Sequence, residues 1–240
     1  MTPTITEPML GAFIVVLLRC GAVAMTAPVI GDSSVPVRAR LVLSVSVALA
    51  IAANHPGVAF AELPHQAILE LASGVITGLT ASFVLARVAI AGQLTGLVLG
   101  LGFAQEFDPQ AGESAGVIRT IAMSIAGLAF LAGDGLEALV RGVATPTSAI
   151  AVGAGCLDVL RIGADAFGHG LALAAPVVLA ALVANVGLAV MNRAAPALNV
   201  FSVALSAVLV VGTMLLLSTT GSFVIGVSEA ARQATQALAP

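Results

Sequence analysis

Long apolar stretches with few interruptions dominate the pattern of this chain. Four stretches contain no Asp, Glu, Lys or Arg, and they cover residues 41–61, 88–105, 166–192 and 194–228. A helix needs roughly 20 apolar residues to cross the hydrocarbon core of a bilayer. The pattern therefore predicts a polytopic all-α membrane protein. A transmembrane barrel is disfavoured because runs such as 180–190 do not alternate between apolar and polar residues.

Proline, glycine and polar residues divide this pattern into about six helices, which together we interpret as a single membrane domain over residues 1–240. The predicted helices cover residues 7–29, 37–53, 64–105, 117–143, 157–192 and 198–225. The third is too long for one simple crossing, and Pro176 is expected to bend the fifth. Residues 105–116 are expected to form a loop, and residues 145–155 a loop or a bent hairpin.

Composition narrows the class of function. Only 9% of the residues are charged, against about 25% in soluble domains, and 59% are hydrophobic. The net charge of −3 and the absence of Lys argue against a nucleic-acid-binding surface. Trp and Tyr, which usually anchor helices at the headgroups, are absent. A chain surrounded by other protein does not need such anchors, which hints at a component of a larger assembly.

Glycines recur at helical spacing in the third predicted helix. Gly74 and Gly78 are four residues apart, and so are Gly92, Gly96 and Gly100. In lipid, residues without side chains matter because they let two helix backbones approach closely. These glycines therefore predict tight helix packing, and they carry no information about chemistry.

Two arginines lie inside apolar segments. An Arg at the centre of a spanning helix costs roughly 2.5–3.5 kcal/mol to insert. Arg19 and Arg87 are therefore expected to pair with another group or to face water. Candidate partners are Glu70 and Glu106, or groups on another chain. The alternative is an Arg near a helix end whose head reaches the interface.

Enzymatic and cofactor chemistry finds no support in the motifs. The sequence contains no H-E-x-x-H, no G-x-S-x-G and no phosphate-binding glycine loop. The three histidines, His55, His65 and His169, lie apart without Cys or carboxylates at metal-ligand spacing. We therefore expect no enzyme, no metal and no cofactor. The carboxylates of the 105–116 loop are candidates for cation binding, although a solvated turn is the commoner case.

Several segments match a known family in order and spacing. They are Arg19, Thr26-Ala27-Pro28, Gly31, Val35-Pro36-x-Arg38-x-Arg40, Glu70-x-x-x-Gly74-x-x-x-Gly78, Gly92-Gln93-x-x-Gly96-x-x-x-Gly100-x-x-Phe103-Ala104, Asp108-Pro109, Phe130-Leu131, Pro176-Val177-Val178 and Asn192-Arg193-x-x-Pro196-x-Leu198-Asn199-x-Phe201. Together they resemble the FliR/SctT family of export-apparatus proteins from flagellar and virulence type III secretion. The chain departs from the family at Asp134-Gly135-Leu136, where Asn-Gly-His is frequent.

The resemblance implies a non-enzymatic core subunit of a protein-export gate in the bacterial inner membrane, at the base of a flagellum or an injectisome. Its implied partners are FliP/SctR-type and FliQ/SctS-type small membrane proteins, the FlhB/SctU-type switch protein and unfolded export substrates. The resemblance also implies that the loop after the glycine-rich helix is a channel plug. The plug residues would be Phe103, Gln105, Glu106, Phe107, Asp108, Pro109, Gly112, Glu113 and Gly116. A polar loop at membrane depth is tolerated where it lines a cavity or is buried in protein.

A small-solute secondary transporter or channel is the alternative function, because it would also show broken helices and charges within the membrane. Such transporters usually contain a repeated half, and no repeat is visible here. Arg38 and Arg40 favour a cytoplasmic first loop and an outside N-terminus. The N-terminal apolar segment is interpreted as the first membrane helix, with a cleaved signal peptide as the alternative.

Overall fold

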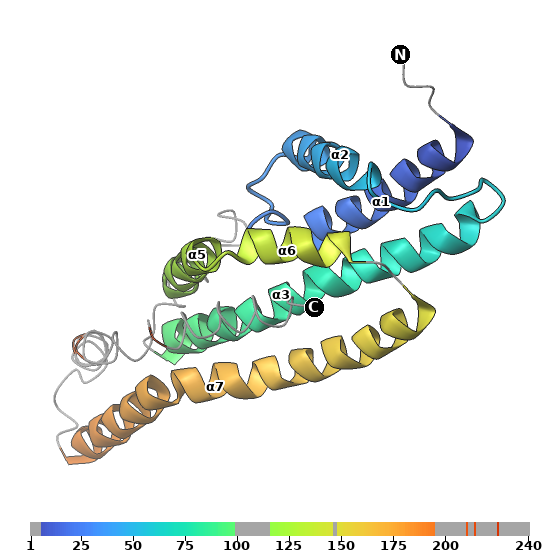
Figure 1. Cartoon of the computed structure of the whole chain (residues 1–240). Coiled ribbons are helices and arrows are strands. Elements are labelled where there is room, and N and C mark those ends of the chain that lie inside the picture. Colours follow the sequence, from blue (N-terminus) through green and yellow to red (C-terminus); the bar gives the residue numbers. More distant parts are fainter. Residues whose placement is uncertain are drawn as a thin grey trace. The chain divides into compact units, whose positions relative to one another are not determined.

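The computed structural model describes residues 6–98, 116–145 and 148–194, together with three single helical positions, Val210, Met214 and Ile225. These residues form six helices in chain order and contain no strand. The helices are α1 (Glu7–Thr26), α2 (Val37–Ala52), α3 (Leu63–Val98), α5 (Val117–Ala132), α6 (Gly135–Ala144) and α7 (Ala149–Ala194) (Figure 1). The predicted all-α class is therefore confirmed.

Three of these helices are long and apolar enough to cross a membrane. They are Glu7–Thr26, Leu63–Val98 and the part of α7 from Ala151 to Met191. A fourth candidate is the pair α5 and α6, if its two bent halves form one span. The described part of the chain thus has the architecture of a polytopic all-α membrane protein.

Proline sets the ends of the first two helices. α1 ends at Thr26, and Ala27 is extended (φ −71°, ψ 146°) because the residue before a proline is excluded from the helical region. α2 begins directly after Pro36. Both helices lie within three residues of their predicted bounds.

The single helix predicted over 117–143 is wrong. The chain leaves the helix at Gly133 and Asp134, and the axes of Ile118–Ala132 and Gly135–Ala144 differ by 63°. Asp134 adopts a left-handed conformation (φ 60°), which Asp tolerates better than most residues. A Cβ at Gly135 would lie 2.5 Å from the Phe130 ring, so this glycine permits the sharp turn.

The loop predicted over 145–155 is also largely wrong, because α7 already begins at Ala149. Ser148 precedes the helix, and its Oγ accepts a hydrogen bond from Ala151 N (3.2 Å), as expected of an N-cap residue. Pro176 lies inside α7 without ending it, and the bend expected there stays a prediction. The predicted helix 198–225 lies outside the described residues except for the three single positions.

The described residues fall into two compact units, and α3, α5 and α7 contribute to both. The first contains residues 6–84, 130–145 and 148–164, and the second contains 85–98, 116–129 and 165–194 with the three single positions Val210, Met214 and Ile225. In the first unit α1 packs against α2 and α6, and its core includes Val15, Val16 and Leu139. In the second unit Val88 and Ala91 of α3 are fully buried.

Candidate functional site

A buried ion pair joins α1 to α3 in the first unit. Arg19 Nε lies 2.5 Å from Glu70 Oε2, and the two side chains are 3% and 4% exposed. The Nε–H is not aligned for a hydrogen bond to this oxygen, so the contact is an ion pair rather than a charge-assisted hydrogen bond. Glu70 is one of the two partners that the sequence offered for Arg19. The other, Glu106, lies outside the described residues.

The same guanidinium also binds the end of α6. Arg19 Nη1 donates hydrogen bonds to the carbonyl oxygens of Val143 (2.6 Å) and Thr145 (2.5 Å). The last carbonyls of a helix have no partner within the helix, and they carry the negative end of its dipole. Arg19 thus caps α6 from a different helix. We call Arg19, Glu70 and these two carbonyls the Arg19 cluster.

Small residues on α3 allow the cluster to form. A Cβ at Gly74, one turn after Glu70, would lie 2.5 Å from the carbonyl oxygen of Arg19. A Cβ at Gly78 would collide with the Thr26 hydroxyl, and Ser82 Oγ donates to the Thr26 carbonyl (2.5 Å). The seam therefore runs along one face of α3 at four-residue spacing, through positions 70, 74, 78 and 82. Without side chains at 74 and 78, α3 approaches α1 closely enough for the ion pair.

The second glycine run behaves differently at its two described positions. In the second unit, a Cβ at Gly92 would lie 2.8 Å from Arg119 Cα, so α3 closely approaches the first turn of α5. A Cβ at Gly96 would meet Ile118 Cβ at 4.0 Å, an ordinary van der Waals contact. Gly100 lies outside the described residues.

Arg87 lies in the second unit, where α7 approaches α3. A Cβ at Gly170 would lie 2.9 Å from the Arg87 carbonyl oxygen and equally close to Ile90 Cβ. Asp165, also on α7, is the opposite charge that acts on Arg87. The sequence analysis did not single out Gly170, because no other glycine lies four residues before or after it. The same holds for Gly11, which lies against the Val58 backbone.

The predicted plug lies almost entirely outside the described residues. Gly116 is the exception, and its carbonyl oxygen accepts a hydrogen bond from Thr120 N (3.0 Å) at the start of α5. The other eight predicted plug residues are Phe103, Gln105, Glu106, Phe107, Asp108, Pro109, Gly112 and Glu113. Their role stays a prediction.

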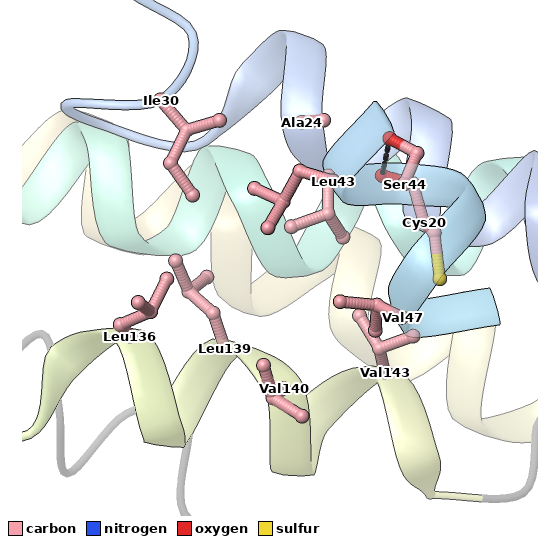
Figure 2. A pocket seen from close by; sticks show the side chains of 11 residues that line it. Cys20, Ala24, Ile30, Leu43, Ser44, Val47, Leu136, Leu139, Val140 and Val143 are labelled. Atoms are coloured by element: carbon pink, nitrogen blue, oxygen red, sulfur yellow. Dashed lines mark hydrogen bonds between the residues drawn. The ribbon is translucent and has the colours of Figure 1, made fainter. Parts of the chain in front are cut away.

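An apolar pocket of about 90 Å³ lies between α1, α2 and α6 (Figure 2). Leu43 and Val47 from α2 face Leu139 and Val143 from α6 across it. Its one hydroxyl, on Ser44, donates to the backbone oxygen of Arg40 (2.8 Å), and the backbone oxygen of Cys20 lies 3.5 Å from it. The pocket therefore offers an apolar surface, and besides this hydroxyl its lining residues carry the Cys20 thiol but no carboxylate, histidine or arginine. Among the described residues, no group of three His, Cys, Asp or Glu could hold a metal ion.

The fold and the buried cluster define a polytopic helical membrane protein with tightly packed helices. Residues 10–234 match the family described as bacterial export proteins, family 1. The chain is 31% identical over 211 residues to the flagellar biosynthetic protein FliR of Escherichia coli (strain K12). The aligned region covers 83% of this chain and 80% of the relative. This chain belongs to the bacterial export proteins, family 1.

Relatives from two further bacteria match over a similar span. The flagellar biosynthetic protein FliR of Aquifex aeolicus (strain VF5) is 30% identical over 229 residues, 90% of this chain and 88% of the relative. The protein of the same name from Caulobacter vibrioides is 29% identical over 214 residues, 84% and 85% of the two chains. The resemblance to the FliR family seen in the sequence motifs is thereby confirmed.

Proposed function

We propose that this chain is a core subunit of the flagellar protein-export apparatus, that it spans the bacterial inner membrane several times, and that it forms part of the channel for unfolded substrates. The observation that carries the proposal is the family match over residues 10–234, together with relatives named flagellar biosynthetic protein FliR. In this role the chain performs no covalent chemistry. A small-solute transporter is the less favoured function, since the relatives reported above carry the name flagellar biosynthetic protein FliR.

The internal packing suits a rigid scaffold. The Arg19 cluster joins α1, α3 and the end of α6. The glycines at 74 and 78 let the backbones of α1 and α3 pack in direct contact, which resists sliding of one helix along the other. Buried charge pairs and close backbone contacts favour one arrangement over alternatives. A subunit around which others assemble needs such a defined shape.

The outer surface suits contacts with other membrane proteins. Large apolar side chains are exposed along α2 and α7, including Val42 (67%), Leu160 (69%) and Val183 (72%). These faces can meet lipid or other apolar helices. The partners we propose are FliP/SctR-type and FliQ/SctS-type small membrane proteins and the FlhB/SctU-type switch protein.

We assign the gate to residues 103–117, on the basis of sequence and of the helices that flank this segment. The segment follows α3 and precedes α5, and these two helices are in close contact through Gly92 and Arg119. Its carboxylates, two glycines and two phenylalanines suit a loop that seals a polar channel and moves without unfolding its scaffold.

Co-purification and motility test the proposed role. A strain that lacks the gene should be non-motile on soft agar and should fail to secrete hook and filament proteins, and the intact gene should restore both. The tagged chain should purify in a stable complex with the two small partners. Purification alone, with normal motility in the deletion strain, would instead favour a transporter. Normal motility with loss of effector secretion would assign the chain to an injectisome.

Deletion of residues 110–115 tests the gate separately. The shortened constriction should leave assembly intact and should make membranes that contain the complex leaky to ions or small solutes. An assembled deletion variant with the conductance of the wild-type complex would remove this loop from the gate, while the assignment to the export apparatus would stand.

A further inference from the structure

The apolar pocket of Figure 2 is built from one face of each of three helices in the first unit. α6 lines it with positions 136, 139, 140 and 143, and α2 lines it with positions 43, 44 and 47. Residues three and four apart share one face of a helix. Since α2 and α6 each pack against α1, the pocket is the space that remains between these two helices over the surface of α1.

The pocket suits hydrocarbon rather than water. The Ser44 hydroxyl donates its proton to the Arg40 carbonyl (2.8 Å), and the other lining side chains are apolar apart from the Cys20 thiol. A buried water typically needs two to four polar partners, whereas an apolar cavity of roughly 150 Å³ stays dry and binds benzene. A pocket of about 90 Å³ therefore takes up a short stretch of hydrocarbon. Leu136 and Val140 of its wall are partly exposed, so hydrocarbon can enter from outside the chain.

A positive charge lies at one end of the pocket. Arg40 precedes the lining residue Leu43 by one turn on the same face of α2. Its guanidinium contacts Met25 Sδ (3.6 Å) through Nη1 and donates to the carbonyl oxygen of Asp32 through Nη2. Met25 directly follows the α1 residues that line the pocket, and Asp32 belongs to the same turn as the lining residue Ile30. The charge therefore lies roughly one helical turn beyond the apolar wall.

The Arg40 charge forms no ion pair within the described part of the chain. The ion pairs found there involve other arginines, and Asp32 binds Arg40 through its backbone oxygen. The Asp32 carboxylate accepts instead from the Ser34 backbone N–H (2.8 Å). A guanidinium carries five N–H groups and is well suited to phosphate oxygens. Arg40 thus retains both charge and donors for an anionic ligand.

From this juxtaposition we propose that the apolar pocket binds one acyl chain of an anionic phospholipid, whose phosphate lies beside Arg40. An amphiphile supplies hydrocarbon and a negative charge within one molecule, which matches the apolar wall and the arginine at its end. An apolar side chain of another protein would fill the pocket and would leave Arg40 without a countercharge. The proposal rests on the membrane class of the chain and not on its role in export.

Photo-crosslinking of the wild-type chain tests the occupant. The full chain is reconstituted in phosphatidylcholine vesicles that contain a small share of phosphatidylglycerol with a diazirine on one acyl chain. Crosslinks should concentrate on pocket residues such as Val47 and Leu139, and should exceed those on the exposed α7 residues Leu160 and Val183. Equal labelling of the two sets would overturn the proposal.

A photoreactive residue in the pocket asks the same question in cells. A photoreactive leucine analogue at Leu136 should crosslink to phospholipid, because this side chain lines the pocket and is partly exposed. A crosslink to another protein instead would overturn the proposal and would make the pocket a protein contact.

A matched pair of valine variants locates the acyl chain. Val47→Phe fills the pocket, and native mass spectrometry of the full chain from detergent micelles should show at least about fivefold less retained phosphatidylglycerol. Val45→Phe adds the same bulk on the opposite side of α2, outside the pocket, and should leave retention unchanged. Equal effects of the two variants, or full retention in Val47→Phe, would contradict this site.

A matched pair of arginine variants locates the phosphate. Arg40→Gln should lower the preference for phosphatidylglycerol over phosphatidylcholine about fivefold, since one arginine near the membrane surface contributes about 1 kcal/mol to anionic-lipid binding. Arg38→Gln removes the same charge from the opposite side of α2 and should have a clearly smaller effect. Equal effects would show a general attraction to the surface, and would overturn the placement of the headgroup beside Arg40.

Discussion

Arg19 of α1 and Glu70 of α3 form an ion pair at 2.5 Å although they lie 51 positions apart in sequence, and neither side chain is more than 4% exposed. The pair is sheltered by close helix packing on one side and by the end of α6 on the other. The free-energy cost of burying the Arg19 charge is offset by Glu70, because no solvent reaches the site to replace Glu70 when it is removed.

Loss of the partner should therefore be costly. Glu70→Ala leaves the Arg19 charge buried, and we expect the free energy of unfolding to fall by about 3–5 kcal/mol. The control is Glu137→Ala, which breaks an exposed pair with Arg141 (2.6 Å, side chains 57% and 68% exposed) and should cost less than about 1 kcal/mol. Denaturant titration in mixed micelles, followed by circular dichroism, measures both. Similar losses in the two variants would show that the buried pair is not special.

A single methyl group on the α3 seam should also disturb the packing. The Cβ of Gly74→Ala would meet Arg19 O at 2.5 Å and Ala22 Cβ at 2.8 Å, so α1 and α3 must separate. We expect a loss of roughly 1–3 kcal/mol in the same titration. Gly153→Ala is the control, because its Cβ meets nothing within 4 Å and alanine favours a helix over glycine by up to about 1 kcal/mol. A neutral Gly74→Ala would contradict the tight seam.

The two described glycines of the second run should differ in their response. Gly92→Ala places a Cβ against the α5 backbone at 2.8 Å and should destabilise the chain by about 1–3 kcal/mol. Gly96→Ala meets Ile118 at 4.0 Å and should be neutral or slightly stabilising for the isolated chain. Comparison of complex yield on native gels then shows whether Gly96 packs against a partner instead. If Gly92→Ala melts like the wild type, the close approach of α3 to α5 is refuted.

The turn between α1 and α2 contains a strained residue that can be relieved. Val29 has φ 68°, a conformation that β-branched side chains rarely adopt. Val29→Asn should raise the free energy of unfolding by about 0.5–1 kcal/mol, because asparagine tolerates this region. Val35→Asn, in the same turn but without a positive φ, should give no gain. A gain in both variants would point to a general preference for polar residues in the turn.

The same turn holds a carboxylate with a shifted titration. The backbone N–H of Ser34 donates to Asp32 Oδ1 (2.8 Å) and, with the Ser34 hydroxyl, lowers the Asp32 pKa below its ordinary 3.8. The ionised form is favoured in the folded state, so its small stabilisation is present above pH 3.8 and is lost as the pH falls through the lowered pKa. An NMR titration of the carboxyl carbon should show the midpoint below 3.8. Ser34→Ala should move the midpoint part of the way back, and a wild-type midpoint at 3.8 would contradict the bond.

The amino-acid sequence by itself determined the class of the protein and several of its boundaries. The apolar stretches required helices that span a membrane, since an unpaired backbone is not tolerated in lipid. Pro28 and Pro36 ended α1 and started α2 locally, because a proline acts on its immediate neighbours whatever surrounds it. The family motifs likewise depend on order along the chain, and the match over residues 10–234 follows the same order.

Tertiary structure alone decided how the charges are paired and where helices bend. The sequence left Glu70, Glu106 and other chains open as partners of Arg19, because distances across 51 residues are set by packing and not by local spacing. The break at Asp134 has a local signal, a charged residue between two glycines, but the contact that makes Gly135 necessary involves the Phe130 ring, whose position only the fold gives. The start of α7 does not follow from the apolar pattern, because the segment lacks helical periodicity and the Ser148 side chain caps the helix. Local chemistry thus fixes where elements begin and end, and side-chain packing between elements fixes which residues form the buried cluster.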